Sequence, residues 1–229
     1  WAKQYFGDWQ PGKDPFKDDP IPEHPPIPHK ELLVVPSPGI PYVIGRYEFQ
    51  GPSIGKDDKS TYTADIFFDM LSQPTSRLQR RLVDSGYAQA VSEFYLTQRY
   101  TGPITITMQT EPDKFNAALG ALQDEMSRWD DTSYFTDAEL ASAKESFRLR
   151  DIYDQQSTSN YIHIISWWWA SASVDYYLNY VKNLQNVTKQ DIAAFVDKYI
   201  KGKNYVLGVT SSQDVLQNVS LDRSKILAW

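Results

Sequence analysis

Proline placement constrains this chain most strongly, because most of its 14 prolines fall between residues 11 and 41. Proline removes a backbone hydrogen-bond donor and disfavours the helical conformation in the residue before it. The stretch is therefore predicted to be an extended linker. We expect residues 1–41 to lie outside the main folded domain, which would then span residues 42–229.

The rest of the chain alternates between strand-like and helix-like patterns. Runs rich in β-forming residues predict strands, and Thr101-Gly102-Pro103 predicts a hairpin turn between two of them. Apolar residues at three- and four-residue spacings predict helices. The predicted strands cover residues 42–49, 87–100, 104–110 and 205–210, and the clearest helices cover residues 61–71 and 115–129.

Local signals place the other helices. A short helix should follow Thr75-Ser76, bury Leu78 and Leu82, and stop at Gly86 in a left-handed conformation. Thr136 with Glu139 fits a capping box, and Thr188 with Asp191 is a weaker variant of it. Between these caps we expect two or three packed helices, with a break near residues 171–173. This order predicts an α+β fold in which helices pack on one face of an antiparallel sheet.

Composition excludes several classes of function. With 41% apolar and 14% aromatic residues, the 229-residue chain can bury one sizeable core or two small ones. Its formal charge of −6 is spread along the sequence, which argues against a nucleic-acid partner. No apolar run approaches the roughly 20 residues that a membrane-spanning helix needs. The absence of cysteine excludes disulfides and thiolate nucleophiles.

Six segments of the chain form a recognisable set. They are Tyr5-Phe-Gly-Asp-Trp9, Ala64-Asp-Ile-Phe-Phe-Asp-Met-Leu, Ser76-Arg-Leu-Gln-Arg-Arg-Leu-Val-Asp-Ser-Gly-Tyr87-Ala, residues 115–129, residues 135–144 and residues 187–192. Together they resemble the second, non-zinc-binding domain of the insulinase and pitrilysin family of zinc peptidases, which includes the mitochondrial processing peptidase. The resemblance implies a LuxS- and processing-peptidase-like metallohydrolase fold, with residues 1–41 as the end of a preceding domain and a linker.

The family binds zinc through His-x-x-Glu-His on a helix with a distant glutamate, and this sequence lacks that motif. His24 and His29 lie among prolines and His163 stands alone, so we expect linker or packing roles for them and no zinc site. The resemblance therefore implies that zinc belongs to a partner domain, in the same chain or in a partner subunit. The chain alone should be inactive as a peptidase.

The resemblance also implies that this domain faces the zinc-bearing domain across a closed chamber and binds the peptide substrate. It assigns to this task an arginine and a tyrosine that fall on Arg80 and Tyr87. A guanidinium can donate to substrate carbonyls, and a phenol can donate to an oxyanion. Arg81 is an alternative if the register differs by one residue, whereas Arg77 is expected to serve the helix itself.

Two other functions stay open. The same fold can serve as a non-enzymatic structural protein, and Trp167-Trp168-Trp169 could stack on sugars in a carbohydrate-binding module. Consecutive helical residues point in different directions, so we favour packing for the tryptophans, with one in the core and another at an interface with the missing domain. Resemblance to bacterial two-domain peptidases suggests the periplasm or cell envelope of a bacterium.

Overall fold

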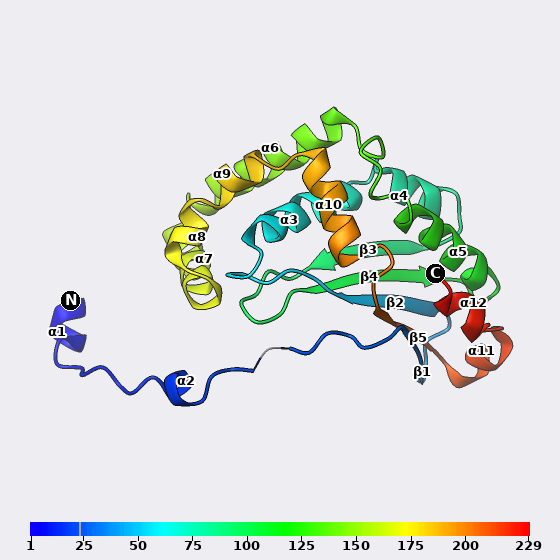
Figure 1. The fold of residues 1–229 in the computed structure, drawn as a ribbon, viewed down its shortest axis with the longest axis horizontal. Coiled ribbons are helices and arrows are strands. Elements are labelled where there is room, and N and C mark those ends of the chain that lie inside the picture. Colours follow the sequence, from blue (N-terminus) through cyan, green and yellow to red (C-terminus); the bar gives the residue numbers. More distant parts are fainter. Residues whose placement is uncertain (23) are drawn as a thin grey trace.

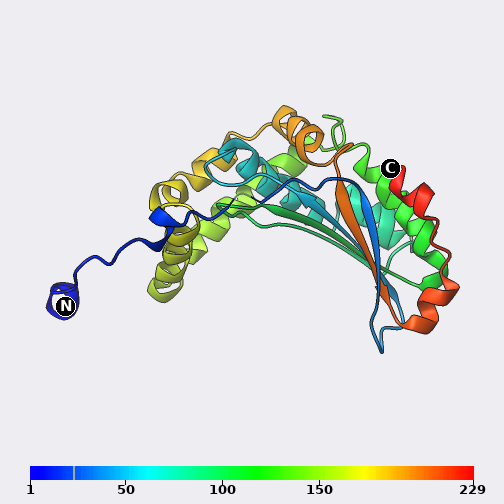
Figure 2. The same ribbon diagram turned by 60° about the horizontal axis from the view of Figure 1, so that its bottom comes forward.

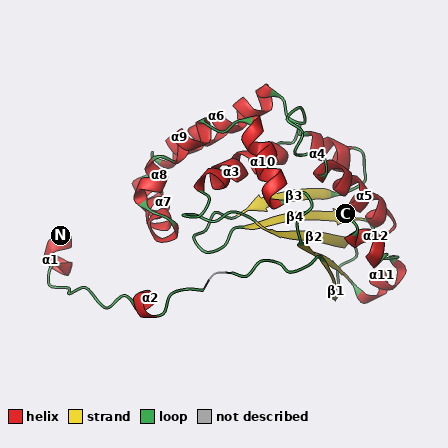
Figure 3. Cartoon of the chain, in the orientation of Figure 1, coloured by secondary structure: helices red, strands yellow, loops and turns green. Residues whose placement is uncertain are grey.

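A five-stranded open sheet forms the centre of the fold in the computed structural model, which describes residues 1–22 and 24–229. The strands lie side by side in the order β1-β5-β2-β4-β3 (Figures 1 and 3). They are β1 (Glu31–Pro36), β2 (Val43–Gln50), β3 (Ala90–Tyr95), β4 (Pro103–Thr110) and β5 (Tyr205–Ser211). Strands from both ends of the chain thus share one sheet.

Most strand pairs are antiparallel. β2 lies between β4 and β5 and is antiparallel to both, so that Tyr47 is opposite Ile106 on one side and Leu207 on the other. β3 pairs with β4 as the hairpin predicted from the sequence. β1 pairs with β5 in the parallel direction, with Leu32 opposite Leu207. The predicted α+β fold is therefore confirmed, with one parallel pair at the edge of the sheet.

The helices lie on one side of the curved sheet (Figure 2). A short π-helix η1 (Arg80–Asp84) and a 3₁₀ turn η2 (Pro112–Lys114) accompany them, and α1 (Ala2–Phe6) and α2 (Pro15–Asp18) lie on an N-terminal segment that extends away from the sheet. The remaining helices are α3 (Asp58–Ser72), α4 (Arg77–Gln79), α5 (Phe115–Met126), α6 (Asp137–Asp154), α7 (Thr158–Ser171), α8 (Val174–Leu178), α9 (Tyr180–Gln185), α10 (Lys189–Tyr199), α11 (Gln213–Asn218) and α12 (Arg223–Leu227).

Burial along the strands shows that the helices cover only one face. In β4 and β5 every second residue is buried, and the residues between them are half-buried. On the other face, β2 presents Arg46 and Glu48, and β3 presents Phe94, whose side chain is 55% exposed. Because successive residues of a strand point to opposite faces, the described residues leave the second face of the sheet open.

Helix α3 anchors the core above the sheet. Its predicted apolar stripe is confirmed, since Ala64, Phe67, Phe68 and Leu71 are all buried. The ring of Phe67 lies 5.3 Å from that of Trp129 and 5.6 Å from that of Phe195. Aromatic pairs at such separations contribute about 0.5–1.5 kcal/mol beyond burial alone. α3 therefore joins two later segments that lie far apart in the sequence into one core.

Strand β1 corrects one expectation. Residues 31–36 were predicted to be linker, but they form an edge strand of the sheet. The segment contains Leu-Leu-Val-Val, which favours a strand, and Pro36 is tolerated because it ends an edge strand. The proline density around this short run concealed its β propensity.

The cap predictions are confirmed and in one case understated. Thr136 with Glu139 forms a capping box, and Thr188 with Asp191 forms a complete one as well. Although Asp191 is shorter than the usual glutamate of a capping box, its Oδ2 accepts a hydrogen bond from the Thr188 N–H at 2.9 Å. Between the two boxes the chain forms four helices, α6 to α9, rather than two or three. Ser173 caps α8 at the predicted break.

Candidate functional site

Arg80 and Tyr87 lie at the two ends of the segment that leads into β3. Ser76 caps this segment, since its Oγ accepts from the Gln79 N–H at 3.2 Å. Leu78 and Leu82 are fully buried on its inner side. Arg80, the first residue of η1, is exposed, whereas Tyr87 is half-buried against the core. The two predicted residues therefore lie on the same short segment but in different environments.

Arg81, and not Arg80, is the arginine that contacts Tyr87. The Arg81 guanidinium lies over the Tyr87 ring, 5.0 Å from its centroid. Such a cation–π contact contributes about 0.5–1 kcal/mol at an exposed position and fixes the orientation of both groups. The structure thus brings together the neighbouring pair that the sequence left open as an alternative.

Gly86 forms the turn between η1 and Tyr87. Its φ of +75° lies in the left-handed region, as predicted. The turn is held by hydrogen bonds from the Gly86 N–H to the Val83 carbonyl at 2.9 Å and from the Ala88 N–H to the Leu82 carbonyl at 2.8 Å. A glycine is required here because other residues are strained at this φ.

Gly86→Ala should lower the free energy of unfolding by about 1 kcal/mol, because a Cβ is disfavoured at positive φ although the space around it is open. Gly120→Ala is the matched control. Gly120 lies within α5, where the added Cβ also meets open space, so alanine should stabilise the domain by up to about 1 kcal/mol. Urea unfolding of both variants measures the difference, and equal effects of the two changes would contradict a conformational requirement at Gly86.

A pocket of about 420 Å³ lies beside this segment, and we call it the arginine pocket. Side chains from α4, η1 and the end of α5 line it. They are Arg77, Arg80, Arg81, Ser85, Asp124, Glu125 and Arg128. The sequence predicted neither the pocket nor Arg128, because Arg128 is far from Arg80 in the chain and only the packing of α5 against η1 brings them together.

Arg77 serves a different purpose from its neighbours. Its Nε lies 3.2 Å from Oε2 of Glu125, a carboxylate whose side chain is only 3% exposed. The Tyr134 hydroxyl donates to the same oxygen at 2.7 Å, and the Arg77 guanidinium lies over the Tyr134 ring. Burial raises the pKa of Tyr134 most, and the nearby Glu125 carboxylate raises it further, so the Tyr134 hydroxyl stays protonated and acts as a donor. Arg77 therefore neutralises a buried acid on α5, beyond the role within its own helix that was predicted.

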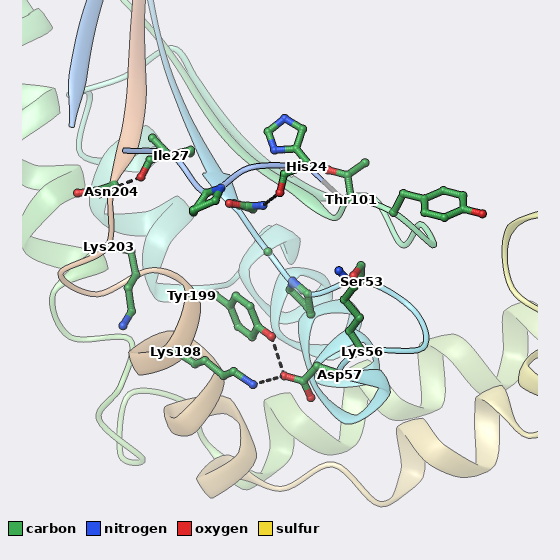
Figure 4. Close-up of a pocket in the computed structure, with 15 residues that line it drawn as sticks. His24, Ile27, Ser53, Lys56, Asp57, Thr101, Lys198, Tyr199, Lys203 and Asn204 are labelled. Carbon is green, nitrogen blue, oxygen red and sulfur yellow. Dashed lines mark hydrogen bonds and ion pairs between the residues drawn. The ribbon is translucent and has the colours of Figure 1, made fainter. Parts of the chain in front are cut away.

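A second pocket, of about 460 Å³, lies where the N-terminal segment crosses the end of the sheet, and we call it the linker cleft (Figure 4). The side chain of Gln50 donates to the His24 carbonyl at 3.3 Å, and the side chain of Asn204 donates to the Ile27 carbonyl at 2.9 Å. Both bonds hold the backbone of the N-terminal segment, so the cleft forms where this segment meets the folded domain.

Asp57 organises the floor of the linker cleft. Its Oδ2 accepts from the Lys198 ammonium and from the Tyr199 hydroxyl, both at 2.6 Å, as Figure 4 shows. Burial alone would raise the pKa of Asp57, but the hydrogen bonds from Lys198, Tyr199 and Ser60 outweigh it and lower the pKa to about 2. Burial and the Asp57 carboxylate raise the pKa of Tyr199 to about 12. This cluster ties α3 to α10 and is already neutralised.

Two acidic residues that were not predicted from the sequence lie in weakly solvated positions: Glu93 on β3 is buried, and Asp65 on α3 is half-buried. Burial raises the pKa of Asp65 to about 7, although the Tyr180 hydroxyl donates to its Oδ2 at 2.6 Å. Burial also raises the pKa of Glu93 to about 7. Neither Glu93 oxygen has a hydrogen-bond partner with good geometry among the described residues, and Ser72 gives it only a weak interaction that lowers the pKa. The two-residue spacing of Val91, Glu93 and Tyr95 could have indicated the burial of Glu93, because it places all three side chains on the same, buried face of β3.

The histidines do not fit a zinc site. His24 lines the linker cleft, His29 is exposed in the N-terminal segment, and His163 lies on α7. Among residues 1–22 and 24–229, no three His, Asp or Glu side chains are grouped so that they could hold a metal ion. In the same part of the chain, no helix is both long and apolar enough to cross a membrane.

The three consecutive tryptophans differ in environment, as expected on a helix. Trp168 is half-buried, and its ring stacks on that of Tyr176 at 5.1 Å. Trp167 is partly exposed, and Trp169 is 69% exposed. One indole therefore packs against the core, and the outermost one is available to another surface.

The fold and sequence relate this chain to known proteins. The sequence profile of the peptidase M16 inactive domain matches residues 1–147. No curated protein matches the chain in sequence. A protease from Helicobacter pylori has a TM-score of 0.80 at 15% identity, covering 92% of this chain and 51% of that one. A peptidase M16 inactive domain from Pseudomonas fluorescens has a TM-score of 0.61 at 18% identity, covering 83% of this chain and 45% of that one.

The periplasmic protease PqqL from Escherichia coli is a further structural neighbour, with a TM-score of 0.59 at 12% identity, covering 81% of this chain and 21% of that one. At these identities the structural likeness establishes the fold, and it confirms the predicted peptidase-like architecture. The chain spans about half the length of the Helicobacter pylori protease. Because the sequence profile covers well over half of its residues, this chain belongs to the family of peptidase M16 inactive domains.

Proposed function

We propose that this chain is the non-catalytic half of a bacterial zinc metallopeptidase, which encloses and binds a peptide substrate opposite a zinc-bearing domain. The observation that carries the proposal is membership of the inactive-domain family. The chain also spans about half of the Helicobacter pylori protease, which leaves length in that protein for a second domain. Zinc would then be held by the partner domain, in the same chain or in a partner subunit.

Exposed apolar side chains support the presence of a partner domain that covers them. One face of the sheet is open, with Phe94 exposed on it, and Trp169 is exposed on α7. The N-terminal segment exposes Trp1, Tyr5 and Trp9, the last being 73% exposed. Large apolar side chains are depleted from free surfaces and enriched at interfaces. We assign these groups to contacts with the zinc-bearing domain.

Arg80 and Tyr87 are the proposed substrate-binding residues, with Arg81 acting alongside them. Arg80 is exposed, and among the described residues its guanidinium has no ion pair or hydrogen bond, so it can donate to peptide carbonyls. Tyr87 can donate its hydroxyl while Arg81 holds its ring in place. The periplasm or cell envelope of a bacterium is the proposed location, in keeping with the periplasmic protease among the structural neighbours.

Arg80→Ala and Tyr87→Phe should each lower kcat/KM for peptide cleavage by about 10-fold or more in the peptidase that contains both halves, which corresponds to roughly 1.4 kcal/mol of transition-state stabilisation. Steady-state kinetics with kcat and KM measured separately tests this. Lys182→Gln, an exposed change on α9, is the control and should leave both constants unchanged. Unchanged kinetics in the first two variants, with folding intact, would instead favour a scaffold domain that takes no part in cleavage.

A further inference from the structure

Three of the arginines that line the arginine pocket have no anionic partner among the described residues. Among the described residues, the guanidinium groups of Arg80, Arg81 and Arg128 form neither an ion pair nor a hydrogen bond. Basic residues elsewhere on the surface are commonly paired, as Lys59 is with Asp191 at 2.5 Å and Lys189 with Asp137 at 2.6 Å. In a chain with a formal charge of −6, this pocket is a local concentration of unbalanced positive charge.

The acidic residues in the pocket do not cancel this charge. Glu125 already accepts from Arg77 and from the Tyr134 hydroxyl, so its charge is compensated by a fourth arginine. Among the described residues, Asp124 is the one other acidic residue that lines the pocket. Three guanidinium groups therefore face one carboxylate. The lining residues therefore leave the pocket with a net positive charge, which attracts an anion.

One of the three guanidinium groups is held in position, and the other two start from backbone that is held by the hydrogen bonds of a helix or a turn. Arg81 lies over the Tyr87 ring, and Arg80 is the adjacent residue of the same π-helix. Arg128 lies in the turn after α5, where the Arg128 N–H donates to the Glu125 carbonyl at 3.0 Å. A cation at a helix C-terminus is stabilised by the helix dipole, which explains one of the three arginines but neither Arg80 nor Arg81. Positioned guanidinium groups suit the two oxygens of a carboxylate.

We propose that the arginine pocket binds a carboxylate of the peptide substrate, so that the substrates are peptides with an acidic side chain or a free C-terminal carboxylate at the residue that reaches it. The inference rests on the proposed function, because a peptide-binding half supplies the ligand. The pocket volume of about 420 Å³ is sufficient for one side chain with its carboxylate.

Fluorescence anisotropy of labelled peptides with the 229-residue chain tests the proposal. One pair of peptides differs only by glutamate or glutamine, with both ends blocked, and a second pair differs only by a free or amidated C-terminus. At least one carboxylate peptide should bind about 10-fold or more tightly than its neutral partner. The first pair identifies an acidic side chain as the ligand, and the second identifies the chain terminus. Equal affinities within both pairs would overturn the inference.

Arg81→Gln/Arg128→Gln should abolish the preference for the carboxylate peptide, whereas Lys3→Gln/Lys182→Gln, which removes the same charge from exposed positions elsewhere, should retain it. Retained preference in the first double variant would place the carboxylate site elsewhere. The binding readout is independent of cleavage. If Arg80→Ala and Tyr87→Phe left cleavage unchanged while the carboxylate preference persisted, the proposed role of these two residues in cleavage would be wrong and the carboxylate site would stand. If Arg80→Ala and Tyr87→Phe lowered kcat/KM as predicted but the peptides showed no carboxylate preference, only the carboxylate site would be wrong.

Discussion

Glu93→Gln is expected to raise the free energy of unfolding by about 2 kcal/mol at pH 8 and to change it little at pH 5. Burial raises the pKa of Glu93 from 4.5 to about 7, so at pH 8 the folded domain contains a buried carboxylate without a good partner. Each unit of pKa shift corresponds to 1.36 kcal/mol, and the polar amide retains part of the burial cost, which together give about 2 kcal/mol. Urea unfolding at both pH values measures the effect.

The sign of the pH dependence follows from proton binding. The folded state keeps the Glu93 proton up to about pH 7, whereas the unfolded chain loses it near its ordinary pKa of 4.5. Between these values the folded state binds more protons, so stability falls as pH rises. Below the lower value the contribution is fully present. The pKa of Asp65 is raised in the same direction and adds to the slope.

Glu93→Gln should therefore flatten the fall in stability between pH 5 and pH 7. Glu111→Gln is the matched control, because Glu111 is an exposed residue whose carboxylate meets only Lys114 at the surface. It should leave the slope as in the wild type. A wild-type slope in Glu93→Gln would show that the Glu93 carboxyl reaches solvent or a cation in the folded protein.

Arg77→Ala should lower the free energy of unfolding by about 2 kcal/mol. Its removal leaves the Glu125 carboxylate buried with only the Tyr134 hydroxyl as a donor. Breaking a fully buried ion pair costs about 3–5 kcal/mol, but the Arg77 side chain is itself 43% exposed, so water screens part of the interaction. Denaturant unfolding at pH 7 gives the difference directly.

Arg80→Ala provides the comparison for Arg77→Ala, since it removes an exposed arginine of the same segment that has no ion pair in the described structure. It should change stability by no more than about 0.5 kcal/mol. Adding Glu125→Gln to Arg77→Ala should restore part of the loss, because the neutral amide needs no counter-charge. Equal effects of Arg77→Ala and Arg80→Ala would mean that Glu125 does not depend on Arg77.

The sequence predicted best those features that depend on local patterns. The apolar stripe of α3 and the caps at Thr136 and Thr188 depend on residues within about two helical turns of each other, and the hairpin of β3 and β4 pairs strands that are adjacent in the sequence. β1 was missed because its partner, β5, lies at the other end of the chain. The prolines around β1 predicted a linker, because the sequence does not show that β5 provides hydrogen-bond partners for this segment.

The candidate site was predicted only in part, for the same reason. The short segment with Arg80 and Tyr87 was located by resemblance, but the contact of Tyr87 with Arg81 depends on the π-helical turn, which sequence spacing does not indicate. Arg128 and Glu125 come from α5 and the turn after it, and only tertiary packing places them beside Arg77. Patterns within one segment cannot show how charges from two segments balance.

Peptide cleavage by the two separately purified halves tests the division of labour between the domains most directly. We predict that this chain alone and the zinc-bearing half alone cleave an extended peptide at background rates, and that mixing them, with zinc bound to the other half, restores cleavage. Full activity of the zinc-bearing half by itself, or cleavage by this chain after stringent metal removal, would contradict the proposed role as a substrate-enclosing, non-catalytic half.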